Sequence, residues 1–234
     1  MHQQTVMLNL WKATEMLNIF LKSLKDILSP AVMAFIIKIG LGSMALMALI
    51  LWIFWNNFSS FIASLVTHIP FIGGLAIVQS SGSFLGALIV GYGLIIALIS
   101  ILTSIYSPKL LIKLAKKSYP QIVASDNSKI SKSIIYNLKA LIIFIILLIL
   151  CLPLIFIPFI GQIVMLLLWA YLLKEPTFYD VSTLFIKNEK EYKGYKSIWI
   201  VAIVASLFNF IPIVNIFAPI FAQIMFMHWL LRRL

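Results

Sequence analysis

Four long apolar stretches, separated by shorter polar or charged segments, dominate the hydrophobic pattern of the chain. The stretches at residues 31–58 and 84–119 are long enough for helices that cross the ~30 Å hydrocarbon core of a bilayer, which takes about 20 residues. Trp52 and Trp55, near the end of the first stretch, are typical of a membrane interface. The pattern therefore predicts an all-α integral membrane protein with two full transmembrane helices.

The other two apolar stretches are each interrupted by a proline-containing turn. Only 34 residues lie between Lys139 and Lys174, and 35 between Lys196 and Arg232. Two crossings and a turn need more residues than this. We therefore interpret residues 134–173 (hairpin 1) and 197–231 (hairpin 2) as re-entrant, hemi-penetrating helical hairpins. Because uncovered backbone groups are costly in lipid, we expect neighbouring helices to shelter both turns.

The two turns share a short sequence motif. Residues 156–161 read Phe-Ile-Pro-Phe-Ile-Gly, residues 210–215 read Phe-Ile-Pro-Ile-Val-Asn, and residues 69–74 contain a third, partial copy. Proline restricts φ, whereas Gly and Asn tolerate left-handed backbone, so the motif predicts a tight break with such backbone at Gly161 and Asn215. The residues assigned to the hairpin turns are Pro153, Pro158 and Pro212.

Residues 6–28 are predicted to form an amphipathic helix ahead of the first span. Apolar residues such as Leu17, Leu21 and Leu24 recur at three- and four-residue steps, and Lys22 and Lys25 take the opposite face. Such a helix fits the plane of the membrane interface. The alternative is a helix that packs on a partner protein.

Composition supports one membrane domain over residues 1–234. The chain is 62% hydrophobic and 11% charged, with a mean hydropathy of +1.08, which excludes a soluble globular domain. The net charge of +11 is better explained by basic cytoplasmic loops that face anionic lipid than by nucleic acid. No Lys or Arg lies between Lys38 and Lys109, so we expect an extracytoplasmic loop at 58–83 and cytoplasmic termini. Residues 120–133 and 175–196 are expected to be solvated connections.

No enzyme motif and no cluster with metal-ligand spacing is present in the sequence, so we expect no enzyme, cofactor or metal. His2, His68 and His228 are scattered, and we expect them to be interfacial or loop histidines. The lone Cys151 is expected to pack as a small apolar residue.

The hairpin motifs, together with Trp169 and Pro219, resemble the sulfate permeases called CysZ, which belong to the group named after the etoposide-induced protein. The likeness covers most of the chain in order. It implies two full transmembrane helices, two hemi-penetrating hairpins, a homo-oligomer and uptake of sulfate. One departure concerns the start of the first long helix, where the permeases carry Pro-Gly and paired arginines. Here Ser29 and Pro30 are followed by Ala31-Val-Met, and the nearest cation is Lys38.

We therefore expect a bacterial inner-membrane permease or channel-like protein for a small inorganic anion such as sulfate. The alternative is a non-transporting membrane scaffold of the same fold. Polar residues embedded in membrane segments are functional candidates. The candidates for anion binding or an anion pathway are Ser29, Lys38, Gly161, Gln162, Asn209 and Asn215. For Asn209 and Asn215 the competing role is helix capping, and for Lys38 it is a snorkelling lysine.

Overall fold

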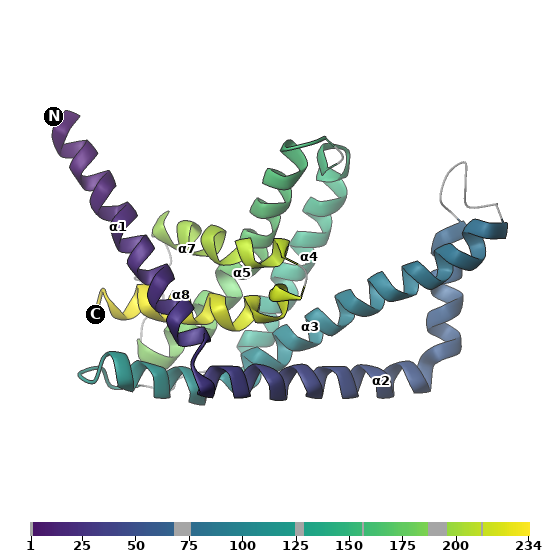
Figure 1. Cartoon of the computed structure of the whole chain (residues 1–234), viewed down its shortest axis with the longest axis horizontal. Coiled ribbons are helices and arrows are strands. Elements are labelled where there is room, and N and C mark those ends of the chain that lie inside the picture. Colours follow the sequence, from purple (N-terminus) through teal and green to yellow (C-terminus); the bar gives the residue numbers. More distant parts are fainter. Residues whose placement is uncertain (1, 68–75, 125–128, 156, 187–195, 212) are drawn as a thin grey trace. The chain divides into compact units, whose positions relative to one another are not determined.

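The computed structural model describes residues 2–67, 76–124, 129–155, 157–186, 196–211 and 213–234 (Figure 1). The described residues form helices and their connections, without a β-strand. The chain divides into two compact units: residues 1–36 with 103–234, and residues 37–102. The third motif copy and Pro212 lie outside the described residues, as does His68.

Both predicted spanning helices are present and are longer than expected. Helix α2 is Pro30–Thr67 and helix α3 is Ala76–Ser118, so each extends into the predicted loop at 58–83. Helix α2 begins at proline because a first-turn residue needs no intrahelical N–H, and the Ser29 carbonyl accepts from the Met33 N–H at 2.9 Å. At Phe54, where φ is −109° and ψ is 19°, α2 is kinked.

Hairpin 1 consists of helices α4 (Ile130–Ile155) and α5 (Ile160–Phe185). Helix α5 continues well past Lys174, and residues 176–185 are all buried. The prediction of a solvated connection at 175–196 is therefore wrong for residues 175–185. The reason is that Phe178, Val181 and Leu184, spaced three apart, pack into the hydrophobic core.

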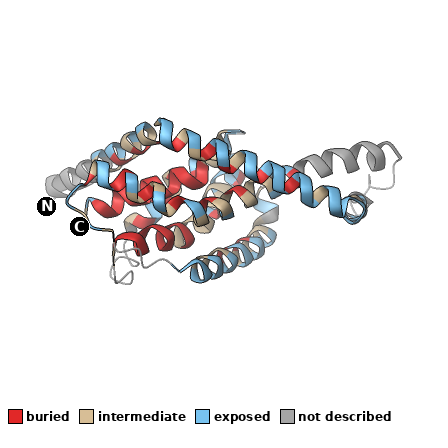
Figure 2. Ribbon diagram, turned by 90° about the horizontal axis from the view of Figure 1, so that it is seen from below, coloured by how far each residue is buried: buried red, intermediate tan, exposed pale blue. Residues whose placement is uncertain are grey.

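Hairpin 2 contains helix α7 (Lys196–Ser206), two short 3₁₀ turns and helix α8 (Ala218–Leu231). The 3₁₀ turns are η1 (Leu207–Phe210) and η2 (Val214–Phe217). All residues of α8 are buried, as the red ribbon in Figure 2 illustrates. Helix α8 is enclosed because α1, α5 and α7 all contact it.

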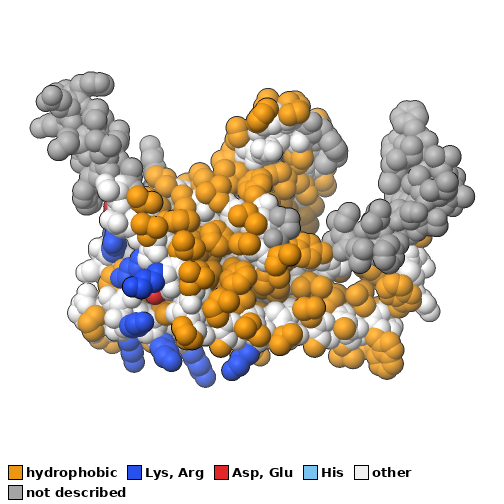
Figure 3. Space-filling model, viewed as in Figure 1, with side chains coloured by type: hydrophobic (Ala, Val, Ile, Leu, Met, Phe, Trp, Pro, Cys, Tyr) orange, Lys and Arg blue, Asp and Glu red, His pale blue; other side chains and the backbone are white. Residues whose placement is uncertain are grey.

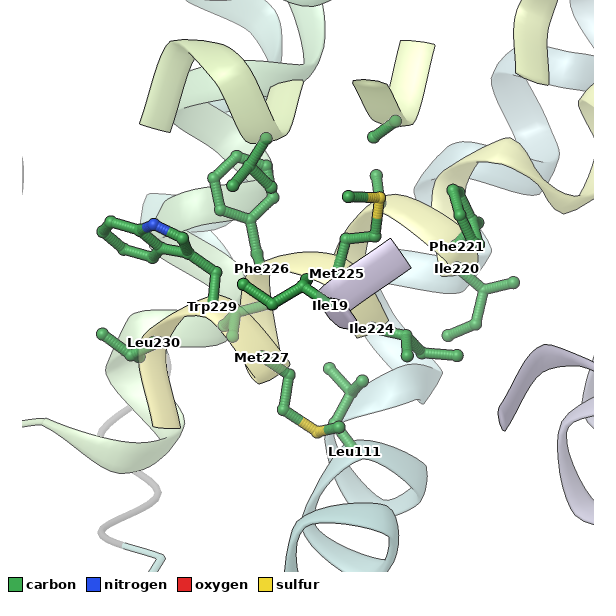
Figure 4. Packing of buried hydrophobic residues seen from close by; sticks show 14 of the residues in the cluster. Ile19, Leu111, Ile220, Phe221, Ile224, Met225, Phe226, Met227, Trp229 and Leu230 are labelled. Carbon is green, nitrogen blue, oxygen red and sulfur yellow. The ribbon is translucent and has the colours of Figure 1, made fainter. Parts of the chain in front are cut away.

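The core of the larger unit is built around α8 (Figure 4). The Phe208 and Phe221 rings stack with centroids 4.0 Å apart, and Phe178 lies edge-on to Trp229. Ile19 from α1 and Leu111 from α3 pack against the same helix. Side chains from α1, α3, α5 and η1 therefore meet at α8.

Helix α1 (His2–Ile27) has two apolar sides rather than one. Ile19, Ser23 and Ile27 are buried in the unit, whereas Leu17 and Leu21 are exposed by 54% and 51%. Of the leucines that predict the helix, Leu24 packs against the core of this chain, whereas Leu17 and Leu21 do not. Those two side chains are available to lipid.

Among the residues that the structure describes, four helical segments are long and apolar enough to cross a membrane: Pro30–Phe61, Leu94–Ser118, Ile130–Cys151 and Val214–Leu231. On the face shown in Figure 3, hydrophobic side chains cover most of the described surface, and Lys and Arg side chains gather toward one side of it. Segments of this length and composition define a multi-pass membrane protein.

Candidate functional site

The bends of the two hairpins have the same backbone conformation. Phe159 has φ 65° and ψ −48°, and Ile213 has φ 70° and ψ −45°. Among the described residues they are the two non-glycine positions with positive φ, and each directly follows the proline of its motif. The sequence prediction of left-handed backbone at Gly161 and Asn215 is therefore wrong by two residues, although the repeat itself corresponds to a repeated structure.

Hydrogen bonds explain this conformation. The Ile160 N–H donates to the Pro158 carbonyl at 2.8 Å, which closes a γ-turn centred on Phe159. The Gly161 N–H then donates to the Ile157 carbonyl at 2.8 Å, and in hairpin 2 the Asn215 N–H donates to the Ile211 carbonyl at 3.0 Å. Positive φ at a non-glycine residue costs about 1–3 kcal/mol, which these backbone bonds offset.

A glycine is required at position 161 because the end of α4 lies too close to leave room for a Cβ atom. The reason is not a positive φ, because Gly161 does not have one. It is buried at the start of α5, and a Cβ built there would collide with the Ile155 carbonyl oxygen and lie 2.7 Å from the Ile155 carbonyl carbon. Both atoms belong to the backbone, which cannot rotate away. The glycine lets the end of α4 and the start of α5 pack directly against one another.

The expectation that neighbouring helices shelter the bends is wrong for both hairpins within a single chain. In hairpin 1 Phe159 is 79% exposed, and in hairpin 2 Ile211 and Ile213 are exposed by 53% and 73%. At the tip of hairpin 1 the N–H groups of Ile160 and Gly161 donate to carbonyls of the same bend, which lowers the cost of contact with lipid. Pro158 lies in the bend, whereas Pro153 lies inside α4, two residues before its end.

The structure places the candidate pathway residues at different points. Asn209 in η1 and Asn215 in η2 belong to segments that contact each other, and Gln162 is exposed in the first turn of α5. Ser29 lies between α1 and α2 in the larger unit, and Lys38 is an exposed residue of the smaller unit.

Asn209 has the most distinctive environment among these candidates. Its amide nitrogen Nδ2 is buried without a hydrogen-bond partner among the described residues. Neither asparagine of hairpin 2 is an N-cap. The N-cap residues of η1, η2 and α8 are Ser206, Ile213 and Phe217. The Ser206 hydroxyl donates to the Ile203 carbonyl at 2.8 Å, and its oxygen lies 3.5 Å from the Leu166 carbonyl oxygen of hairpin 1.

A buried polar cluster joins α1, the end of α3 and α8. His228 is completely buried, and its Nε2 lies 2.8 Å from Asp26 Oδ2. Its Nδ1 lies 3.1 Å from the Tyr119 hydroxyl. The Lys22 ammonium sits 4.1 Å from the centroid of the Tyr119 ring, a cation–π contact at the edge of the cluster.

The sequence prediction that His228 is an interfacial or loop histidine is therefore wrong. Helix α8 is enclosed by α1, α5 and α7, so the polar atoms of His228 must find their partners inside the protein. The partners of His228 come from residues more than a hundred positions away and give no local signal.

A second buried polar group lies on α5, outside the four candidate spans. The Ser133 hydroxyl of α4 donates to Asp180 Oδ1 at 2.6 Å, and the Ser104 hydroxyl of α3 lies near this carboxyl. Burial raises the pKa of Asp180 to about 6, and the hydroxyls of Ser133 and Ser104 limit this increase. No local sequence signal marks Asp180 as a buried group.

The raised pKa of Asp180 predicts a pH dependence of stability. The native-state pKa of about 6 exceeds the ordinary value of 3.8, so the folded protein binds more protons between these values and loses stability as pH rises through them. Relative to Asp180→Asn, the wild type should lose up to about 3 kcal/mol of unfolding free energy between pH 4 and pH 7. Thermal unfolding in detergent and metal-free buffer measures this. Parallel pH profiles for the two proteins would contradict the prediction.

No group of three or more His, Cys, Asp or Glu side chains capable of holding a metal ion occurs in the part of the chain that the structure describes. The Asp26–His228–Tyr119 cluster contains one carboxylate and one imidazole, fewer than a structural zinc site requires. These groups are suited to hydrogen bonding inside the helical unit.

The apolar helices and the two hairpins with matching bends define the class of the protein: a multi-pass α-helical membrane protein with broken helices. The chain belongs to the family described as Sulfate transporter CysZ/Etoposide-induced protein 2.4, which matches residues 19–219. No curated protein and no solved structure matches the chain.

Proposed function

We propose that the protein is an inner-membrane permease or channel-like protein for a small inorganic anion, with sulfate as the first candidate. Family membership over residues 19–219 is the observation that carries this proposal. The matching bends of hairpins 1 and 2 add to it, because paired broken helices are a feature of transporter binding sites.

Helix lengths support the re-entrant reading of hairpin 2. The 11 residues of α7 rise about 16 Å and the 14 residues of α8 about 21 Å, at 1.5 Å per residue. Both values are below the ~30 Å of the hydrocarbon core, so we propose that this bend lies inside the membrane. In hairpin 1, α4 and α5 have 26 residues each, and the proposal there rests on Lys139 and Lys174, which would mark the headgroup level.

A contact between a lysine of hairpin 1 and a tryptophan of hairpin 2 supports the proposal that the two hairpins enter the membrane from the same side. The Lys174 ammonium of α5 lies 4.2 Å from the centroid of the Trp199 ring of α7. Lysine and tryptophan both favour the interface, so the wide ends of hairpins 1 and 2 would meet the same, cytoplasmic headgroup layer. The exposed leucines of α1 would lie in that layer too.

The pathway would use uncharged donors. Asn209 Nδ2 is a buried amide donor with no described partner, and donors of this kind can bind an anion without holding it permanently. Ser29, Lys38, Gly161, Gln162 and Asn215 remain further candidates. We also propose a homo-oligomer whose second copy would cover the exposed tip of hairpin 1 at Phe159.

Uptake of radiolabelled sulfate into proteoliposomes tests the proposed function. We expect sulfate flux well above that of empty vesicles, and a loss of several-fold in Asn209→Ala because the amide donor is removed. Asn137→Ala, which removes a donor from the Ser133 carbonyl in α4, is the control. Flux equal to that of empty vesicles for sulfate, phosphate and chloride alike would refute the permease.

A second candidate function is a non-transporting scaffold of the same fold. It is favoured by the start of α2, where residues 31–33 are Ala-Val-Met and no cation precedes Lys38. Crosslinking that recovers a stable partner, with normal sulfate-dependent growth of a deletion strain, would favour the scaffold over the permease.

A further inference from the structure

One oxygen of the buried Asp180 carboxyl is left without a partner. The residue is only 7% exposed, and its Oδ2 is buried with no hydrogen-bond partner among the described residues. The ion pairs found in the described chain involve Glu175, Asp26 and Glu15, so no described Lys, Arg or His lies within 4.0 Å of Asp180. A buried carboxylate without a countercharge is strongly unfavourable.

Oxygen atoms from three helices surround this carboxyl. Ser104 belongs to α3, Ser133 to α4 and Asp180 to α5, and all three lie in the same compact unit. Further hydroxyl-bearing residues are buried on α3 and α5: Thr103, Ser107, Thr177, Ser182 and Thr183. Carboxylate and hydroxyl oxygens are hard ligands, the type that alkali and alkaline-earth cations prefer.

A proton alone does not complete this site. If Oδ2 carried the proton, its O–H would have no acceptor, and if Oδ1 carried it, Oδ2 would be a carbonyl oxygen without a donor. A metal cation, by contrast, takes its coordination directly from Oδ2. One carboxylate balances a single positive charge, whereas a divalent ion would leave the buried site with a net charge.

We propose that Asp180, Ser133 and Ser104 form a binding site for one monovalent metal cation, Na⁺, which ties α5 to α3 and α4. This goes beyond the proposed anion permease and does not depend on it. The described chain has no further His, Cys, Asp or Glu that would complete a metal cluster here, which separates the site from those of transition metals.

Equilibrium binding of ²²Na⁺ to the purified full-length protein in detergent tests the site. The buffer is choline chloride at about pH 7.5, above the pKa of Asp180, and contains no sulfate. We expect saturable binding of about one Na⁺ per chain and its loss in Asp180→Asn, which keeps the side-chain shape but removes the charge. Ser133→Ala should raise the Kd about tenfold, because a bond to the carboxylate is lost.

Glu175→Gln is the matched control, because it removes a carboxylate from the same helix outside the site and should leave the Kd unchanged. Absence of saturable ²²Na⁺ binding by the wild type would overturn the proposal. So would an unchanged Kd in Ser133→Ala, which decides the matter even if Asp180→Asn does not fold. Because sulfate is absent throughout, a failure of sulfate transport leaves this test unaffected.

Discussion

Gly161→Ala should unfold hairpin 1 or force it open. The added Cβ would occupy the position of the Ile155 carbonyl oxygen, and that oxygen cannot move without breaking the end of α4. We expect a loss of at least about 3 kcal/mol, the upper range for overpacking. The midpoint of thermal or SDS-induced unfolding in detergent measures the effect.

Gly42→Ala is the matched control for this substitution. Gly42 is also a helical glycine, but a Cβ there meets no atom within 4 Å. Alanine should therefore leave stability unchanged or raise it by up to about 1 kcal/mol through helix propensity. If both variants unfold at the wild-type midpoint, the close approach of α4 and α5 at Gly161 is incorrect.

Asp26→Ala should cause the second large loss of stability. It removes the carboxylate that lies 2.8 Å from His228 Nε2 and leaves a fully buried ring nitrogen without its partner. Removal of one member of a buried pair costs about 3–5 kcal/mol when both are charged and about 1–3 kcal/mol when they are neutral. We expect about 3 kcal/mol, measured by the same unfolding assay.

Two comparisons make the result specific to the buried pair. Glu15→Ala removes the carboxylate 3.2 Å from Arg233, where both side chains are partly exposed, and should cost less than about 1 kcal/mol. Asp26→Asn keeps a side-chain oxygen near His228 and should be milder than Asp26→Ala. Equal effects of Asp26→Ala and Glu15→Ala would show that the cluster does not stabilise the unit.

The sequence predicts the helices of this protein well because the driving pattern is local. Long apolar runs specify α2 and α3, and Pro30 marks the start of α2 where it is found. The continuation of α5 through Phe185 was missed, since Lys174 and Glu175 suggest a surface. Tertiary packing of Phe178 and Leu184 overrides that local signal.

The sequence predicts the positions of the two bends but not their backbone conformation. The repeated proline motif correctly identifies two equivalent bends, whereas Pro108, Pro153 and Pro176 lie inside helices without ending them. It does not identify Phe159 and Ile213 as the residues with positive φ, because propensity assigns that role to Gly and Asn. The position of the residue with positive φ is set by hydrogen bonds across the γ-turn, which exist only in the folded hairpin.

The buried polar groups could not be predicted. His228 meets Asp26 and Tyr119, and Asp180 meets Ser133, across long stretches of sequence. One chain carries no local pattern for such pairs. Their position is fixed by how α8 and α5 pack among the other helices.

Cysteine accessibility at the two bends tests the central claim most directly, that both hairpins turn back inside the membrane. Phe159→Cys and Val214→Cys would be made separately in a Cys151→Ser background and treated in intact cells with a membrane-impermeant maleimide. Val123→Cys, at a position 83% exposed in the connection before α4, is the control for cytoplasmic exposure. The account predicts that neither bend is labelled from the periplasmic face. Rapid labelling of both bends from that face would show that the hairpins cross the bilayer completely and would contradict it.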